Sequence, residues 1–178
     1  ENLDPVAIFT FNYDKKYESL KTKRQNSEKK LIKERKDISY PTYSELYDEL
    51  NESKPELVFT IRDSDDRVVK KIYKKPSKGL NRFQWNLRYE VKDPISLGSS
   101  SFYNPFAGVS EGTLVYPGTY FIDMSVLKGG NTTKLIDSKS FNVVSLKNTV
   151  MPTDDRKAKV EFQRKVSLLQ AEISEYSK

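Results

Sequence analysis

The stretch LNRFQWNLRY, residues 80–89, decides the fold class of this chain. Large apolar side chains occupy every second position, from Phe83 through Trp85 and Leu87 to Tyr89, and polar side chains stand between them. A period of two is typical of a β-strand with one buried face. Trp85 is the only tryptophan of the 178 residues, and a side chain of this size dominates a small core. We therefore expect a mainly β protein built around this strand.

Five other stretches alternate in a similar way and are separated by polar or glycine-containing turns. They are residues 6–13, 57–62, 67–73, 119–126 and 134–144. Several short strands joined by hairpin turns, with an inward-facing tryptophan, are typical of an Ig-like or fibronectin-type antiparallel β-sandwich. We expect this sandwich to extend over residues 1–150.

A helical insertion is expected between the first and second strands, over about residues 15–53. Residues 15–36 contain neither glycine nor proline and few apolar side chains, so they predict a helix that remains mostly in solvent. Pro41 ends this segment, because a proline disfavours the helical conformation in the residue before it. Ser44 is expected to cap a second, shorter helix over residues 45–52.

The last segment, residues 151–178, predicts a C-terminal helix capped by Thr153 or Asp154. Its apolar side chains recur at alternating spacings of four and three, which places them on one helix face. These side chains are Phe162, Val166, Leu169, Ile173 and Tyr176. We expect the first four to form a helix interface, which packs on the domain itself, on the insertion or on a partner chain.

The composition excludes several kinds of chemistry. The chain has no cysteine, which excludes disulfides, thiol catalysis and cysteine-rich zinc sites. It has no histidine, which removes the usual general base and the usual metal ligand. The paired carboxylates Asp154 and Asp155 fall in the first turn of a helix, where they offset the helix dipole. We expect a domain without catalytic residues, metal or cofactor.

The acidic stretch DSDD, residues 63–66, begins like a calcium-binding loop. An EF-hand requires a glycine at the sixth position of the loop and a glutamate at the twelfth, and here these positions hold Val68 and Lys74. Aspartate and serine also favour turns, because their side chains bond the nearby backbone. A hairpin turn is therefore the expected role of this stretch.

The net charge of +6 is concentrated in residues 21–36, which hold eight basic and two acidic side chains. Such a stretch can mark a contact with nucleic acid or an anionic surface. Few aromatic residues are interleaved with it and no groove-reading motif is present, so we expect a solvated helix face and no nucleic-acid partner. No apolar run is long enough to cross a bilayer, and no transmembrane segment is expected.

Three motifs resemble the Ig-like domain of flagellar hook-capping proteins and related bacterial secretion modules. LVFTIRDSDDRVVKK, residues 57–71, resembles the hairpin of that domain. GLNRFQWNLR, residues 79–88, resembles its following "G-x-x-x-x-x-W-D" strand, with Asn86 in place of the usual aspartate. LVYPGTYFI, residues 114–122, resembles its "hxxGxY" strand. The resemblance covers roughly residues 55–145 and implies the same sandwich.

The order of segments is similar to a wider context. A basic helical insertion, SYPTYSEL at residues 39–46, the Ig-like core and a closing segment at 148–166 resemble the C-terminal region of large exported bacterial proteins. Those proteins carry a sortilin-like, BNR-repeat propeller and are often labelled glycosyl-hydrolase-like. The resemblance implies a non-catalytic accessory or assembly domain that is periplasmic, outer-membrane-associated or extracellular. Its partner would be the upstream propeller of the same polypeptide or another protein. The start at Glu1, without a methionine, fits a processed protein or a piece of a longer one.

A carbohydrate-binding module is the alternative. Residues 92–112 are rich in Ser, Gly, Asn and Pro, and a loop of this length inside a compact domain is usually functional. The aromatic residues in and beside it would stack on the sugar faces of a polysaccharide, or else cover the open end of the sandwich. The candidates for this ligand or partner contact are Phe102, Tyr103, Phe106 and Tyr116.

Overall fold

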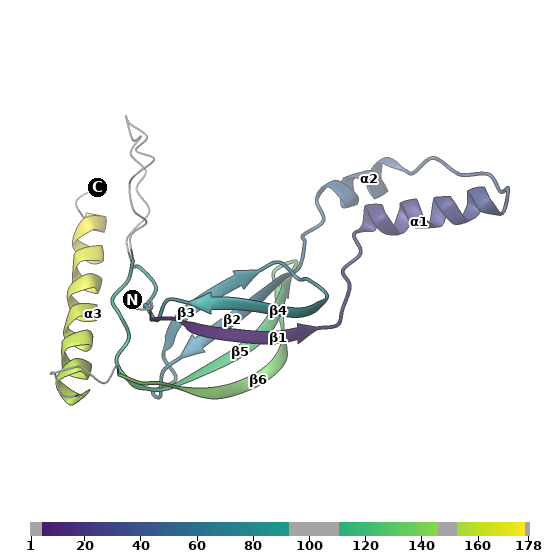
Figure 1. Cartoon of the computed structure of the whole chain (residues 1–178). Helices are drawn as coiled ribbons and strands as arrows, with labels where there is room; N and C mark the ends of the chain where they lie inside the picture. The colour runs from purple at the N-terminus through teal and green to yellow at the C-terminus, as the bar shows by residue number, and fades with distance from the viewer. Residues whose placement is uncertain (1–4, 93–110, 146–152, 177–178) are drawn as a thin grey trace, which may run out of the picture.

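The computed structural model describes residues 5–92, 111–145 and 153–176 of the chain. These residues form two antiparallel β-sheets and three α-helices. Figure 1 shows the sheets at the centre, two helices projecting from one end of them and the third helix standing at the opposite end. The mainly β prediction is confirmed, with helices inserted after the first strand and a helix at the C-terminal end.

The smaller sheet pairs β1 (Ala7–Tyr13) with β4 (Gly79–Trp85), and Phe9 lies opposite Phe83 in this ladder. The tryptophan strand was predicted to run from residue 80 to residue 89, and its second half is wrong. It ends at Trp85 because Leu87 adopts a φ of 53°, a left-handed conformation that leaves the extended ladder.

The larger sheet has the strand order β3–β2–β5–β6. Its strands are β2 (Glu56–Arg62), β3 (Val68–Lys74), β5 (Gly118–Lys128) and β6 (Asn131–Val143). The central strand β2 is buried on both faces from residue 57 to residue 61. The hairpin turn between β5 and β6 uses Gly129 and Gly130 with φ values of 56° and 79°, which glycine adopts without a steric penalty.

Aromatic rings connect the two sheets. The rings of Phe59 on β2 and Phe83 on β4 lie 4.4 Å apart between centroids, and those of Trp85 and Tyr120 lie 6.0 Å apart. Trp85 is 1% exposed, and its indole Nε1 donates a hydrogen bond of 3.0 Å to the carbonyl oxygen of Arg88. The tryptophan therefore lies in the core between the sheets, where the alternating pattern placed it.

The inserted helices α1 (Leu20–Lys33) and α2 (Tyr43–Leu50) form a projection that we call the helical arm. The predicted cap of the second helix, Ser44, is wrong, because Thr42 is the N-cap and Ser44 lies inside the helix. Thr42 and Glu45 form a capping box, in which each side chain bonds the backbone of the other residue. Neither helix of the arm contains a buried residue.

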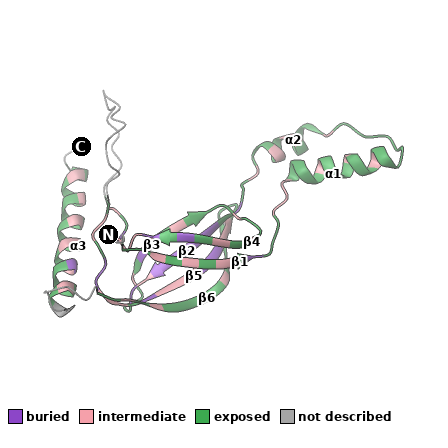
Figure 2. Ribbon diagram, in the orientation of Figure 1, coloured by how far each residue is buried: buried purple, intermediate pink, exposed green. Residues whose placement is uncertain are grey.

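The third helix, α3 (Thr153–Tyr176), lies where the C-terminal helix was predicted. Figure 2 shows it as mostly exposed or half-buried, in contrast to the buried positions along the strands. No helix in the described ranges is both long enough and apolar enough to cross a membrane.

Candidate interaction site at the C-terminal helix

The contact of α3 with the sheets depends on one apolar side chain and several charged ones. Val160, 8% exposed, packs into the core cluster that contains Tyr89 and Tyr116. The Arg164 guanidinium lies 4.4 Å from the centroid of the Tyr89 ring, and the Lys157 ammonium lies 5.6 Å from that of Tyr116. These cation–π contacts hold the N-terminal half of the helix against the end of the sheets.

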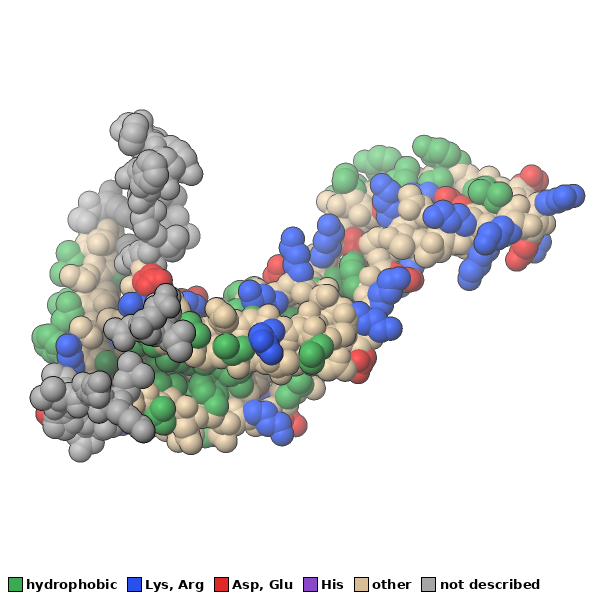
Figure 3. Space-filling view, viewed as in Figure 1, with side chains coloured by type: hydrophobic (Ala, Val, Ile, Leu, Met, Phe, Trp, Pro, Cys, Tyr) green, Lys and Arg blue, Asp and Glu red, His purple; other side chains and the backbone are tan. Residues whose placement is uncertain are grey.

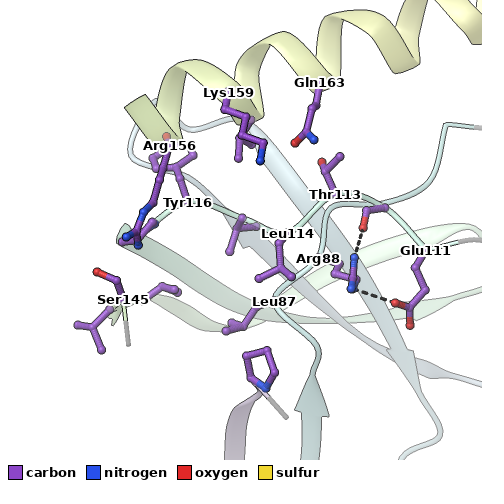
Figure 4. A pocket seen from close by; sticks show the side chains of 17 residues that line it. Leu87, Arg88, Glu111, Thr113, Leu114, Tyr116, Ser145, Arg156, Lys159 and Gln163 are labelled. Carbon is purple, nitrogen blue, oxygen red and sulfur yellow. Dashed lines mark hydrogen bonds and ion pairs between the residues drawn. The ribbon is translucent and has the colours of Figure 1, made fainter. Parts of the chain in front are cut away.

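A cavity of about 650 Å³ lies between α3 and the loops at this end of the sheets. In Figure 4, Lys159 and Gln163 reach down from the helix, while Leu87 and Leu114 form part of the opposite wall. Arg88 is held at the side by an ion pair of 2.8 Å with Glu111 and by a hydrogen bond to a backbone carbonyl oxygen. The helix is therefore not closely packed on the domain along this side.

A second cavity, of about 250 Å³, lies under α3 where the helix passes over the start of β3. Val68 and Val69 of β3, Tyr89, and Arg164 and Leu168 of the helix are among the residues that line it. With a hollow on either side of its contact line, α3 meets the sheets only along a narrow line through Val160.

A buried carboxylate organises the turn between β2 and β3 close to this contact. Asp63 is 1% exposed, and its Oδ1 accepts hydrogen bonds from the backbone N–H groups of Asp65 (3.0 Å) and Arg67 (2.9 Å). Its Oδ2 accepts a third bond of 2.9 Å from the Arg67 Nε. Arg67 also faces Glu161 of α3, with 3.8 Å between Nη2 and Oε1. The hairpin turn predicted for residues 63–66 is confirmed.

Tyrosines fill the core beneath α3. The Tyr120 hydroxyl donates a hydrogen bond of 2.8 Å to the carbonyl oxygen of Tyr116. Burial is the main cause, and the neighbouring Tyr89 the second, that raises the pKa of Tyr120 well above its ordinary value. Burial also raises the pKa of Tyr89. Both rings belong to the core cluster that α3 covers.

The predicted contact aromatics have different outcomes. Tyr116 is 7% exposed and belongs to the core, because its ring packs near Tyr120 and under Lys157. It offers no open ring face to a sugar. Phe102, Tyr103 and Phe106 lie outside the described residues. In the described part of the chain, no group of three or more acidic side chains is placed to hold a metal ion.

The apolar stripe predicted on the C-terminal helix points away from the sheets. Phe162 is 67% exposed, and Leu169 and Ile173 are 57% and 58% exposed. Figure 3 shows apolar side chains along the outer edge of α3. We call Phe162, Val166, Leu169 and Ile173 the outward face. At 100° per residue it lies roughly 180–240° around the helix from Val160. The domain therefore binds one side of α3 and leaves the opposite side open.

Hydrophobic periodicity could not reveal the inward side of α3. Apart from Val160, the positions that continue this side along the helix are Arg164, Ser167, Ala171 and Ser174, which together form no apolar stripe. The interaction of arginine with a tyrosine ring requires partners that are far apart in sequence. The local sequence pattern therefore does not predict the contact of Arg164 with Tyr89.

The helical arm carries a second group of exposed aromatic residues. Tyr40, Tyr43 and Tyr47 are all exposed, and the last two stack with ring centroids 6.3 Å apart. The arm is held together by Arg24, whose Nε and Nη2 donate to the two carboxylate oxygens of Glu49 at 2.6 and 3.0 Å. The hydrogen bond from Arg24 holds the pKa of Glu49 below its ordinary value.

Comparison with known protein families, with curated proteins and with solved structures found no match. The Ig-like type and the exported, propeller-containing context therefore stay predictions from sequence motifs. Function has to be inferred from the surfaces and contacts of the chain itself.

Proposed function

We propose that this chain is a non-catalytic accessory or assembly domain of the Ig-like β-sandwich type, within a larger exported bacterial protein. Its task is to hold another domain of the same polypeptide, or a partner protein, against α3. The observation that carries the proposal is the outward face, a row of large apolar side chains exposed on the side of α3 opposite its buried contact.

The energetics of the outward face support a docking role. Full burial of a large aliphatic or aromatic side chain is worth about 1.5–3 kcal/mol. The four side chains of the outward face are one-third to two-thirds exposed, so a partner that covered them would gain roughly 4–6 kcal/mol before the cost of association is subtracted. A continuous apolar strip of this kind is typical of an interaction surface.

The chemistry of the core supports a structural role. Asp63 is the fully buried carboxylate among the described residues, and both of its oxygens are used by the turn it organises. The buried tyrosines near it are kept neutral by their raised pKa values. Asp63 holds the turn between β2 and β3, and the Tyr120 hydroxyl binds the backbone of Tyr116.

Site-specific photo-crosslinking in the full-length protein tests the proposal. A photoreactive residue at Phe162 or Ile173 is expected to crosslink to another domain or protein, identified by mass spectrometry of the joined peptides. The same residue at Leu80, which is exposed on β4, is the matched control and is expected to give only background. If the α3 positions crosslink no more than Leu80, the outward face is not an interface and the proposal fails.

Carbohydrate binding is a second candidate, favoured by the stacked and exposed tyrosines of α2. Aromatic rings with free faces are able to pack on the apolar side of a sugar. Titration with polysaccharides is then expected to change tyrosine fluorescence saturably, and Tyr43→Ala together with Tyr47→Ala is expected to abolish the change. Trp85 emission is expected to stay constant, because the indole is buried in the core. A flat titration excludes this candidate.

A further inference from the structure

We propose that the outward face of α3 binds α3 of a second copy of this chain, and that the two helices lie antiparallel. This inference rests on the proposed function, since it names the partner of the same surface. It is carried by the spacing of the apolar residues, by the charges beside them and by the position of the sheets relative to the helix.

The outward face repeats with the period of a two-stranded coiled coil. Val166 and Ile173 occupy the a positions of a heptad, and Phe162, Leu169 and Tyr176 occupy the d positions. We call these a and d residues the seam. An apolar strip confined to a and d positions is narrower than the apolar side of a helix that packs on a globular core. The pattern therefore fits one more helix rather than a broad surface.

The charges that flank the seam select the orientation. Lys165 and Glu172 occupy successive g positions, both are exposed, and neither forms an ion pair within the described chain. In an antiparallel pair, g positions face g positions, so each Lys165 meets the Glu172 of the other copy, twice by symmetry. In a parallel pair, Lys165 would face Gln170, which carries no charge. Only the antiparallel pair satisfies both charges.

The a and d residues fit the same antiparallel register. With Val166 of one copy opposite Leu169 of the other, Phe162 lies opposite Ile173, and the arrangement is self-complementary as a two-fold axis requires. The layers formed by Phe162, Val166, Leu169 and Ile173 then each contain two large apolar side chains, and Tyr176 lies beyond them, opposite Lys159. A slip by one residue in either direction would place polar side chains in the layers.

The position of the sheets permits this pairing. Val160 and its neighbours bind the sheets with the side of α3 that is opposite the seam, and they lie in the N-terminal half of the helix. In an antiparallel pair the two sets of sheets therefore lie on opposite sides and near opposite ends of the helix pair. At 1.5 Å per residue, the 24 residues of α3 span about 36 Å, so the sheets of both copies have room along the helix pair.

Sedimentation equilibrium over a concentration range from about 1 to 500 µM tests the inference with the chain of residues 1–178. The wild-type chain is expected to pass reversibly from the monomer mass to twice that mass. Leu169→Asp, which places a charge in the centre of the seam, is expected to weaken association at least ~100-fold, because the charge is buried twice in the dimer. Leu50→Asp, the same substitution at an exposed leucine of the arm, is the control and is expected to leave association unchanged.

Charge reversal tests the orientation. Lys165→Glu and Glu172→Lys, each alone, are expected to weaken association about tenfold at low salt, because two attractive pairs become repulsive. The double exchange is expected to restore it, since the pairs then re-form with opposite sign. A merely structural role of either residue in α3 would not give this rescue. If single and double exchanges associate equally well, the antiparallel pairing is wrong.

The outcomes separate this inference from the proposed function. If the wild-type chain stays monomeric up to 500 µM, or if Leu169→Asp dimerises like the wild type, self-association through α3 is refuted. Should Phe162 nevertheless crosslink to another domain or protein in the full-length molecule, the proposed function stands with a different partner. Absence of both dimer and crosslink refutes both.

Discussion

Removal of the Asp63 carboxylate is expected to destabilise the β-sheets strongly, although the residue lies in a turn. Asp63→Ala deletes the acceptor of three hydrogen bonds, two from backbone N–H groups and one from the Arg67 guanidinium. It also leaves the backbone N–H groups of residues 65 and 67 without that acceptor. The turn joins β2 to β3, so its loss weakens the hairpin that supports one edge of the larger sheet.

The magnitude follows from the three bonds and the burial of the carboxylate. Hydrogen bonds to a charged group contribute about 1.5–3 kcal/mol each, but the desolvation of the carboxylate offsets several kcal/mol of this sum. The partner Arg67 is partly in solvent, which moderates the loss further. We expect Asp63→Ala to lower the free energy of unfolding by about 3 kcal/mol. Asp63→Asn keeps the Oδ1 acceptor and loses the ionic bond to Arg67, so we expect it to lower the free energy of unfolding by about 1.5–2 kcal/mol.

Urea unfolding followed by the fluorescence of Trp85 measures this effect, because the indole lies in the core between the sheets. With a denaturant slope of about 2 kcal/mol per molar, a loss of 3 kcal/mol lowers the midpoint by roughly 1.5 M. Ser64→Ala, an exposed position in the same turn, is the control and is expected to change stability by less than about 0.5 kcal/mol. If Asp63→Ala unfolds at the midpoint of Ser64→Ala, the carboxylate does not organise the turn.

Three further predictions concern other parts of the chain. Gly112→Ala is expected to lower the free energy of urea unfolding by roughly 2–4 kcal/mol, because a Cβ would collide with the backbone carbonyl of Tyr89. A variant as stable as the wild type would contradict that contact. Gly130→Ala has open space around the new methyl group but keeps a φ of 79°, so only about 1 kcal/mol is expected in the same assay, and a loss as large as that of Gly112→Ala would be inconsistent with this. Arg24→Met is expected to speed amide hydrogen exchange in α2 and to leave Trp85 unfolding unchanged. The pKa of Glu49 is lower in the folded arm than its ordinary value of 4.5, so its stabilising contact is present at neutral pH and is lost as the pH falls through that lowered pKa. Exchange in α2 that is independent of pH after correction for the intrinsic rate would refute the Arg24–Glu49 contact.

Much of the β-structure could be predicted because it depends on local alternation. Phe83 and Trp85 fall on the same face of a strand, and burial of that face is the strongest local signal a sequence carries. Tight turns are equally local, since paired glycines permit the positive φ values that a two-residue hairpin requires. The left-handed conformation of Leu87 was not predictable in this way, because leucine carries no local preference for it, and the adjacent bridge of Arg88 with Leu114 joins residues far apart in the sequence.

The site depends on contacts between distant residues, and these were less accessible. Tyr116 looks like any other loop aromatic in the sequence, and only the position of Tyr120 and α3 explains its burial. The exposure of the stripe predicted on α3 could not be foreseen, because periodicity identifies an apolar side without identifying what covers it. At the start of α2, two residues capable of capping lie close together. Glu45, three residues after Thr42, completes a capping box and so selects Thr42 rather than Ser44 as the N-cap.

The helical arm also has a mechanical consequence, because its two ends are attached to different sheets. It leaves from the end of β1, in the smaller sheet, and returns into β2, at the centre of the larger one. A pull on the arm along β1 would load the seven-residue ladder with β4 in shear, with all of its perpendicular hydrogen bonds sharing the force. The weak internal contacts of the arm would yield first. Under such a pull, the two helices of the arm would separate while the sheets stay folded.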